Sequence, residues 1–391
     1  MLKELFSSSN SKTSYDLETI NILRLIRSEN VGPKTFYSLI KLFGDATNAI
    51  EHIGEFSLRG GSSKAIKVFS KSDAEKEIEL LEKNNAKLIT YKSPQYSKLL
   101  FEIYDPPPIL SYKGNIELLN HNRCVAIVGA RNASANGRSF AHKIASDLIE
   151  QGYITVSGLA RGIDSSVHQA STSKTIGVIA GGIDHIYPPE NKKLFESLAL
   201  DGLIIAELPI GSTPLGKHFP QRNRIISGLS LGTVVIEASL KSGSLITARF
   251  ALEQNREIFA VPGFPLDPRC QGTNKLIKEG AYLVESVENI VANLPQHEKF
   301  VQKNESLVKD FIELDVNFKK VNAGYMKEPT QNERAKIISL LSAVPIDFDY
   351  LEKETQLPLP ILYIIILELE LAGKVIRHPG NRISLINNNH R

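Results

Sequence analysis

Between residues 85 and 294, short runs of aliphatic residues alternate with amphipathic segments, and this alternation restricts the fold more than any other feature. Alternation of this kind is typical of a parallel sheet whose strands are joined by helices. We expect strands at residues 125–128, 154–157, 175–180, 203–208, 233–237, 257–261 and 282–284. Helices are expected between them, at residues 137–150, 164–171, 190–200, 223–228, 244–255 and 274–278. The sequence therefore predicts an α/β fold with an extended Rossmann-like, doubly wound, mostly parallel sheet.

The flanking segments predict two smaller domains and a linker. Residues 1–90 predict a helical domain of the SAM or helix-hairpin-helix type, with helices at 16–28, 35–43 and 73–84. The Rossmann-like domain is expected at 91–296, followed by a polar linker at 297–327. Residues 328–391 predict a winged helix, with helices at 332–342, 347–354 and 359–372 and a strand pair at 375–378 and 382–386.

The third helix of this expected winged helix does not have the composition of a DNA-reading helix. It carries two glutamates and no lysine or arginine, whereas groove recognition uses arginine, lysine, asparagine or glutamine. We therefore interpret the C-terminal domain as a protein-contact or regulatory module.

Overall composition excludes some classes of protein and leaves others open. The net charge of +3 over 391 residues is too small to indicate nucleic-acid binding by itself. The basic residues are concentrated, however: residues 123–143 hold four and no acid, and residues 211–249 hold five against Glu237. This distribution favours a polyanionic ligand. Two cysteines and scattered histidines predict no disulfide framework and no metal site, and the absence of a long apolar run predicts no membrane span, so we expect a cytoplasmic protein.

Glycine-rich or basic turns follow the expected strands, where sheets of this type bind their ligands. Arg131 follows the first strand in a βα turn without the Gly-x-Gly-x-x-Gly spacing, which disfavours a dinucleotide and leaves a cation for an exposed phosphate. Gly181 and Gly182 follow another strand, where glycine lets the backbone approach a ligand. Nearby Tyr187 either stacks on a base or belongs to the core. Arg161, in the turn after the second strand, contacts either Asp164 or a ligand.

The segment 219–230 is the strongest candidate for phosphate binding. Arg222 and Arg224 flank Asn223 near an expected helix start, and Pro220 suits a first helical turn. Helix N-termini bind anions through free N–H groups, and arginine forks onto phosphate oxygens. Lys241 and Ser244 belong to another turn, which either caps a helix or contacts phosphate.

Two catalytic patterns are present but lack a working context. Residues 211–217 match the spacing of a phosphate-binding loop, yet His218 replaces the magnesium-binding hydroxyl and Pro220 interrupts the helix. Residues 228–232 match a nucleophile elbow but lie after a helix and before a strand, the reverse of the required order. We therefore expect no catalytic residues and no cofactor.

In their order along the chain, these motifs resemble the DNA-processing protein A family, also called DprA or Smf. The matching segments are 105–107, 128–131, 157–164, 183–191, 207–211, 219–230, 237–238, 242–248 and 261–263. The resemblance implies a non-enzymatic protein of natural transformation that binds and protects single-stranded DNA and helps to load the RecA recombinase. It also implies a homodimer formed through the Rossmann-like domain. The implied DNA contacts are Arg131, Gly181, Gly182, Lys217, Phe219, Arg222 and Arg224, with Phe219 as a base-stacking platform. With the phosphate candidates above, the predicted contact set also includes Asn223, Lys241 and Ser244.

Two other functions stay open at this point. A nucleotide-processing enzyme of the lysine-decarboxylase-like phosphoribohydrolase type has a related fold, but its Pro-Gly-Gly-x-Gly-Thr-x-x-Glu turn is incomplete here, because Gly232-Thr233 is followed by Val235-Ile236. A protein-interaction scaffold that does not bind DNA is the other alternative.

Overall fold

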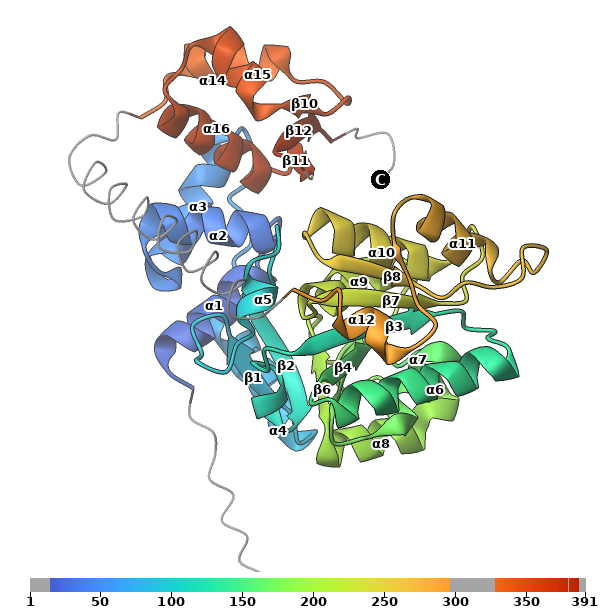
Figure 1. Ribbon diagram of the computed structural model, residues 1–391. Helices are drawn as coiled ribbons and strands as arrows, with labels where there is room; N and C mark the ends of the chain where they lie inside the picture. Colours follow the sequence, from blue (N-terminus) through green and yellow to red (C-terminus); the bar gives the residue numbers. More distant parts are fainter. Residues whose placement is uncertain (1–14, 296–327, 379, 387–391) are drawn as a thin grey trace, which may run out of the picture.

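The computed structural model describes residues 15–295, 328–378 and 380–386. In these ranges the chain forms a helical N-terminal domain, a central α/β domain and a small C-terminal domain that lies beside the N-terminal one (Figure 1). The expected linker at 297–327 lies outside the described residues. No helix within the described ranges combines the length and the apolar character that a membrane crossing requires.

The N-terminal domain is helical, as predicted, and contains one helix that we did not expect. Its helices are α1 (Leu17–Arg27), α2 (Pro33–Phe43), α3 (Ala46–Arg59) and α4 (Lys71–Lys83). Gly32 and Pro33 begin α2, because proline suits the first helical position. The unexpected helix, α3, begins after Asp45, whose carboxylate accepts a hydrogen bond from the Asn48 amide at 2.8 Å.

The central domain is built on a nine-stranded sheet within the described residues, in the order β1-β2-β6-β5-β4-β3-β7-β8-β9. From β6 to β9 all neighbouring strands are parallel, whereas β2 pairs antiparallel with both β6 and β1. The strands are β1 (Lys87–Thr90), β2 (Ile109–Gly114), β3 (Cys124–Gly129), β4 (Ile154–Ser157), β5 (Thr175–Ile179), β6 (Leu203–Ala206), β7 (Gly232–Ile236), β8 (Glu257–Ala260) and β9 (Tyr282–Leu283). The predicted parallel strands are confirmed, and β1 and β2 extend the sheet beyond the prediction.

Helices cover both faces of this sheet, which makes it doubly wound as predicted. One buried cluster joins α6, α7 and α12 to one face, and a second joins α9 and α10 to the other. The helices are α5 (Lys98–Phe101), α6 (Ala135–Glu150), α7 (Ile163–Ala170), α8 (Lys192–Asp201), α9 (His218–Gly228), α10 (Gly243–Glu253), α11 (Gln271–Lys278) and α12 (Val287–Val291), with short 3-10 turns at Ile116–Leu118 and Pro189–Asn191. Helix α9 begins five residues before the expected 223–228, so Pro220 lies inside its first turn.

The order of the strands locates the ligand crevice. Strand β3 has β4 on one side and β7 on the other, so the chain reverses its direction of winding at β3. In open α/β sheets, ligands bind beyond the carboxyl ends of the strands at such a switch point.

The C-terminal domain is the predicted winged helix. It consists of α14 (Gln331–Leu340), β10 (Ile346–Asp347), α15 (Phe348–Thr355), α16 (Leu359–Leu371), β11 (Val375–His378) and β12 (Arg382–Leu385). Strand β12 lies between β10 and β11 in an antiparallel sheet, so β10 adds a strand to the expected pair.

The third helix of the winged helix, α16, packs against the N-terminal domain. Its residues Ile364, Leu367 and Leu371 belong to the same buried cluster as the cores of α1, α2 and α3. The approach is close, because a Cβ added to Gly60 would lie 2.0 Å from the carbonyl oxygen of Glu368. The helix that reads DNA in other winged helices therefore contacts this chain's own helical domain, in agreement with its lack of basic residues.

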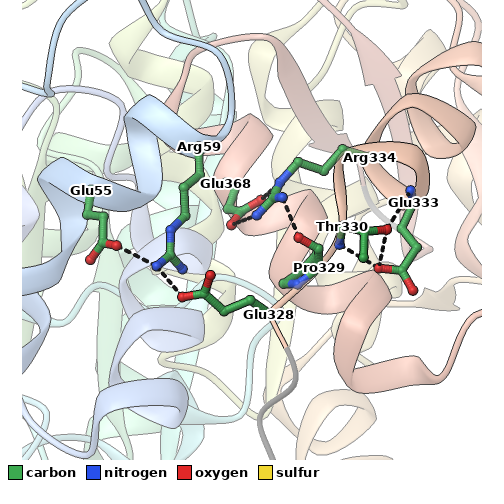
Figure 2. A network of polar contacts seen from close by, with 8 residues as sticks. All are labelled: Glu55, Arg59, Glu328, Pro329, Thr330, Glu333, Arg334 and Glu368. Carbon is green, nitrogen blue, oxygen red and sulfur yellow. Dashed lines mark hydrogen bonds and ion pairs between the residues drawn. The ribbon is translucent and has the colours of Figure 1, made fainter.

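Ion pairs surround this contact (Figure 2). At the end of α3, Arg59 pairs with Glu55 and, at 2.6 Å, with Glu328 at the start of the C-terminal domain. Within the C-terminal domain, Arg334 of α14 donates to both carboxylate oxygens of the fully buried Glu368, at 2.7 and 2.8 Å. Glu368 is thus used to hold the fold together.

Candidate nucleic-acid interface

A cleft of about 790 Å³ lies beyond the carboxyl ends of β3, β4 and β7, at the switch point of the sheet. Its walls come from the turns after these strands, the segments after β5 and β6, helices α9 and α10, and the loop before α11. Of the predicted contact residues, the cleft is lined by Arg131, Phe219, Arg222, Asn223 and Ser244. The structure thus brings together side chains from segments that lie more than 100 residues apart in the sequence.

Arg131 and two aromatic rings form one wall of the cleft. The exposed guanidinium of Arg131 lies 4.8 Å from the centre of the Phe219 ring. Tyr187 meets Phe219 edge to face, with the ring centres 5.7 Å apart, and 47% of Tyr187 is exposed. A cation over an aromatic surface can contact a phosphate and a base at the same time.

Arg222 supplies a fixed charge to the floor of the cleft. Its Nη1 donates to the carbonyl oxygens of Gly158, at 2.6 Å, and Val178. A Cβ at position 158 would lie 2.2 Å from Nη1, so the glycine leaves the space that this guanidinium occupies. Burial lowers the pKa of Arg222 to about 10, with Asp164 opposing and Arg131 adding to the shift. The side chain therefore stays charged at neutral pH, and its orientation is set by the protein.

Asp164 is the counterpart of Arg222 in this floor. Its carboxylate accepts from the amides of Gly158 and Ala160, at 3.2 and 3.3 Å, and so fixes the turn after β4. Burial raises the pKa of Asp164, while the charge of Arg222 acts in the opposite direction. Arg161 forms an ion pair with Glu190, which is not one of the two partners, Asp164 or a ligand, expected from the sequence.

The sequence predicted Arg131 and Arg224 as contacts of the same ligand, but the structure does not bring them together in the cleft. Its side chain is 8% exposed, and it does not line the cleft. Its Nη2 pairs with Glu207, and its Nε lies 3.2 Å from Asp105. Arg224 therefore joins α9 to the segments after β6 and before β2.

The two glycines after β5 lie close to another segment of the chain, and Gly181 also lines a small pocket beside Tyr187, Phe219 and Arg222. The amide of Gly182 donates to the Ser212 carbonyl at 2.8 Å, and a Cβ on Gly182 would lie 2.6 Å from the Pro209 carbonyl oxygen. A Cβ on Gly181 would lie 2.9 Å from the Ser212 carbonyl oxygen. The close approach that requires glycine is thus to the chain's own 209–214 segment.

The remaining predicted contacts divide into two groups. Asn223 donates to the Gly243 carbonyl at 3.3 Å, and Ser244 hydrogen-bonds Ser242 at 2.7 Å, so both shape the cleft where α9 meets α10. Lys217 and Lys241 are exposed but are not among the residues that line the cleft.

Comparison with known proteins decides the family. The family model described as DNA recombination-mediator protein A matches residues 87–295. The chain belongs to this family. Models for the DprA-like N-terminal HHH domain and the DprA winged helix domain match residues 16–79 and 326–381.

Named relatives agree with this membership of the DNA recombination-mediator protein A family. The DNA processing protein DprA of Bacillus subtilis is 47% identical over 53% of this chain and 71% of its own length. Protein Smf of Escherichia coli is 35% identical over 81% of this chain and 82% of its own. The X-ray structure of DprA from Streptococcus pneumoniae matches with a TM-score of 0.60 and 33% identity, covering 72% of this chain and 98% of that one. The resemblance and the fold class inferred from the sequence are thereby confirmed.

Two residues of the cleft in this family member were not selected from the sequence. Tyr187 was considered both as a stacking residue and as a core residue, and the structure places it half exposed in the cleft wall. Arg269, in the loop after β8, also lines the cleft, and Asp267 holds its guanidinium through contacts of 2.7 to 3.2 Å. Its position beyond the carboxyl end of a strand is the signal that could have identified it.

Among the described residues, no group of three or more histidine, cysteine or carboxylate side chains could hold a metal ion. The cleft contains one carboxylate among its described lining residues, Asp164, and backbone amides already occupy it. What the arrangement offers a ligand is positive charge, aromatic surface and hydroxyl groups.

Proposed function

We propose that this protein binds single-stranded DNA in the cleft and carries out no catalysis there. The observation that carries the proposal is the arrangement of Arg131, Phe219 and Tyr187 above the fixed charge of Arg222. Bases present their faces for stacking only when they are unpaired, and stacking on an aromatic side chain contributes about 1–3 kcal/mol per base. Guanidinium groups attract the phosphates regardless of sequence, so binding is sensitive to salt and nearly independent of base identity.

The biological setting of the proposal rests on family membership. We propose that the protein acts in natural transformation and recombination, protects incoming single strands, and helps to load the RecA recombinase. A homodimer formed through the central domain and a cytoplasmic location belong to the same proposal. The relatives named DNA processing protein support the role in DNA processing, and the α/β core they share with this chain contains the cleft.

Titration of a labelled oligothymidylate at several salt concentrations, against a duplex of the same length, tests the binding proposal. We expect the single strand to bind more tightly than the duplex. Arg131→Glu is expected to weaken this binding and to reduce its dependence on salt, since each lost phosphate contact removes about 0.7 from the slope of log K against log salt concentration. Arg123→Glu is a matched control, because Arg123 is also exposed and lies 4.2 Å over an aromatic ring, Tyr153. It directly precedes β3, so it lies at the amino end of that strand, whereas the cleft lies beyond the carboxyl end. Equal loss in the two variants would indicate a general charge effect and remove the cleft from the proposal.

The competing function, nucleotide hydrolysis of the phosphoribohydrolase type, has a direct test. The hydrogen bonds that the Asp164 carboxylate accepts from backbone amides argue against this function, since a general acid or base must reach the substrate. Release of base or phosphate from nucleotides by the purified protein, above a boiled control, would replace the DNA-binding proposal with the enzymatic one.

A further inference from the structure

Three large apolar side chains stand in solvent on two loops beside the cleft. They are Leu240, in the turn after β7, and Phe264 and Leu266, in the loop between β8 and α11, and they are 56, 67 and 79% exposed. We call these three residues the lip. In Figure 1 the loop between β8 and α11 projects beyond the edge of the sheet.

Hydrogen bonds hold the loop of Phe264 and Leu266 in place. The side chain of Asn274 accepts from the Gly263 amide at 3.1 Å and donates to the Gly263 carbonyl at 2.9 Å. A turn follows, in which the Asp267 amide donates to the Phe264 carbonyl at 3.0 Å. A fixed loop that exposes two apolar side chains loses little conformational entropy when it binds a ligand, so it is suited to recognition.

The lip is continuous with the cleft on both loops. Leu240 lies between Ser239 and Ser242, which both line the cleft, and Arg269 lines it from the loop that carries Phe264 and Leu266. The first turn of α11, directly after the loop of Phe264 and Leu266, is tied to the turn of Leu240, since the Gly272 amide donates to the Ala238 carbonyl at 2.7 Å. A strand lying in the cleft and leaving past Arg269 therefore passes over the lip.

We propose that the lip binds the nucleotides that leave the cleft, with Phe264 as a second base-stacking platform. This inference rests on the proposed binding of single-stranded DNA, and it extends the contact beyond the wall of Arg131 and Phe219. The exposed ammonium group of Lys241, adjacent to Leu240, supplies charge for the phosphates of the same nucleotides. A second copy of the chain is a poorer occupant, because three side chains provide far less than the roughly 800 Å² per partner of a stable interface.

The length dependence of binding tests the inference. The probes are oligothymidylates from about 4 to about 16 nucleotides, the range of known single-strand site sizes. We expect Phe264→Ala to leave the affinity for the shortest oligonucleotide that the parent protein binds unchanged. The same variant is expected to weaken the affinity for the longest oligonucleotide by about 5- to 150-fold, the equivalent of one stacked base. Leu266→Ala is expected to act in the same direction. Leu200→Ala is the control, because Leu200 is 81% exposed at the end of α8 and is expected to change neither affinity.

The outcomes separate this inference from the proposed function. If Arg131→Glu weakens the binding of the shortest oligonucleotide while Phe264→Ala leaves the affinity for every length unchanged, the cleft binds DNA and the lip does not. If Phe264→Ala instead shifts the oligomeric state in sedimentation with unchanged DNA affinity, the lip contacts a second copy and the inference is overturned. If the parent protein binds no oligonucleotide, both the proposed function and the inference fail.

Discussion

Replacing Arg224 by methionine is expected to destabilise the central domain without weakening the binding of single-stranded DNA. The substitution leaves the carboxylates of Glu207 and Asp105, which are 21 and 34% exposed, without their guanidinium partner. Removing one member of a fully buried pair costs about 3–5 kcal/mol, and the partial exposure of both carboxylates places this case near about 3 kcal/mol. For a domain of about 200 residues, that loss lowers the melting temperature by roughly 6–12 °C.

Thermal unfolding followed by circular dichroism measures this loss, and an oligothymidylate titration well below the transition measures binding. Arg131→Met is the matched control, since its exposed side chain is expected to show the reverse result, with weaker binding and nearly unchanged stability. Adding Glu207→Gln to Arg224→Met is expected to recover part of the lost stability, because it removes a carboxylate that has lost its partner. If Arg224→Met instead retained its melting temperature and lost affinity for DNA, Arg224 would be a DNA contact and the role assigned to its ion pairs would be wrong.

Three further predictions concern other parts of the molecule. Gly60→Ala is expected to separate the winged helix from the N-terminal domain, because the added Cβ meets the backbone carbonyl of Glu368 at 2.0 Å; an increased radius of gyration in solution scattering checks this, and an unchanged one refutes it. Burial, with a smaller contribution from the charge of Arg222, lowers the pKa of His168 to about 3. The contribution of neutral His168 to the free energy of unfolding is therefore fully present above about pH 6.5 and falls by about 1.4 kcal/mol per pH unit as the pH drops toward 3. His168→Gln is expected to flatten this acid limb of the stability profile, and an equally steep limb would refute the assignment. Burial raises the pKa of Cys124 to about 12, so a thiol reagent is expected to modify the partly exposed Cys270 first in the native protein, and rapid modification of both would refute this.

The parallel core of the fold could be predicted because its strands are continuous apolar runs that end in glycine-rich or basic turns. Strands β3 to β7 are almost wholly buried, and so is the second half of β8, so their sequences carry a strong signal. Strands β1 and β2 were missed because they pair antiparallel at the edge and are separated by an irregular segment with a single short helix. Helix α3 was missed because small residues, Ala46 and Ala49, form part of its buried face and weaken the apolar periodicity.

The candidate interface could be located from the sequence, but the roles of its residues could not all be assigned. Arg222 and Arg224 are both basic and only two positions apart, and composition does not distinguish them. Residues two apart on a helix are rotated by about 200° around its axis, and here α9 presents Arg222 to the cleft and Arg224 to Glu207 and Asp105. Arg224 turns away from the cleft because it pairs with Glu207 and Asp105. These two carboxylates are distant from Arg224 in the sequence and come close to it only when the chain is folded.

Cross-linking of a bound oligothymidylate by ultraviolet light, followed by mass spectrometry of the modified peptides, tests the location of the DNA most directly. Stacked bases and aromatic rings are in contact, so we expect modified peptides that contain Phe219 and Tyr187, and we expect the first of these to disappear in Phe219→Leu. Modification confined to the winged helix or the N-terminal helices, with none in the peptides that line the cleft, would show that single-stranded DNA binds elsewhere on the molecule.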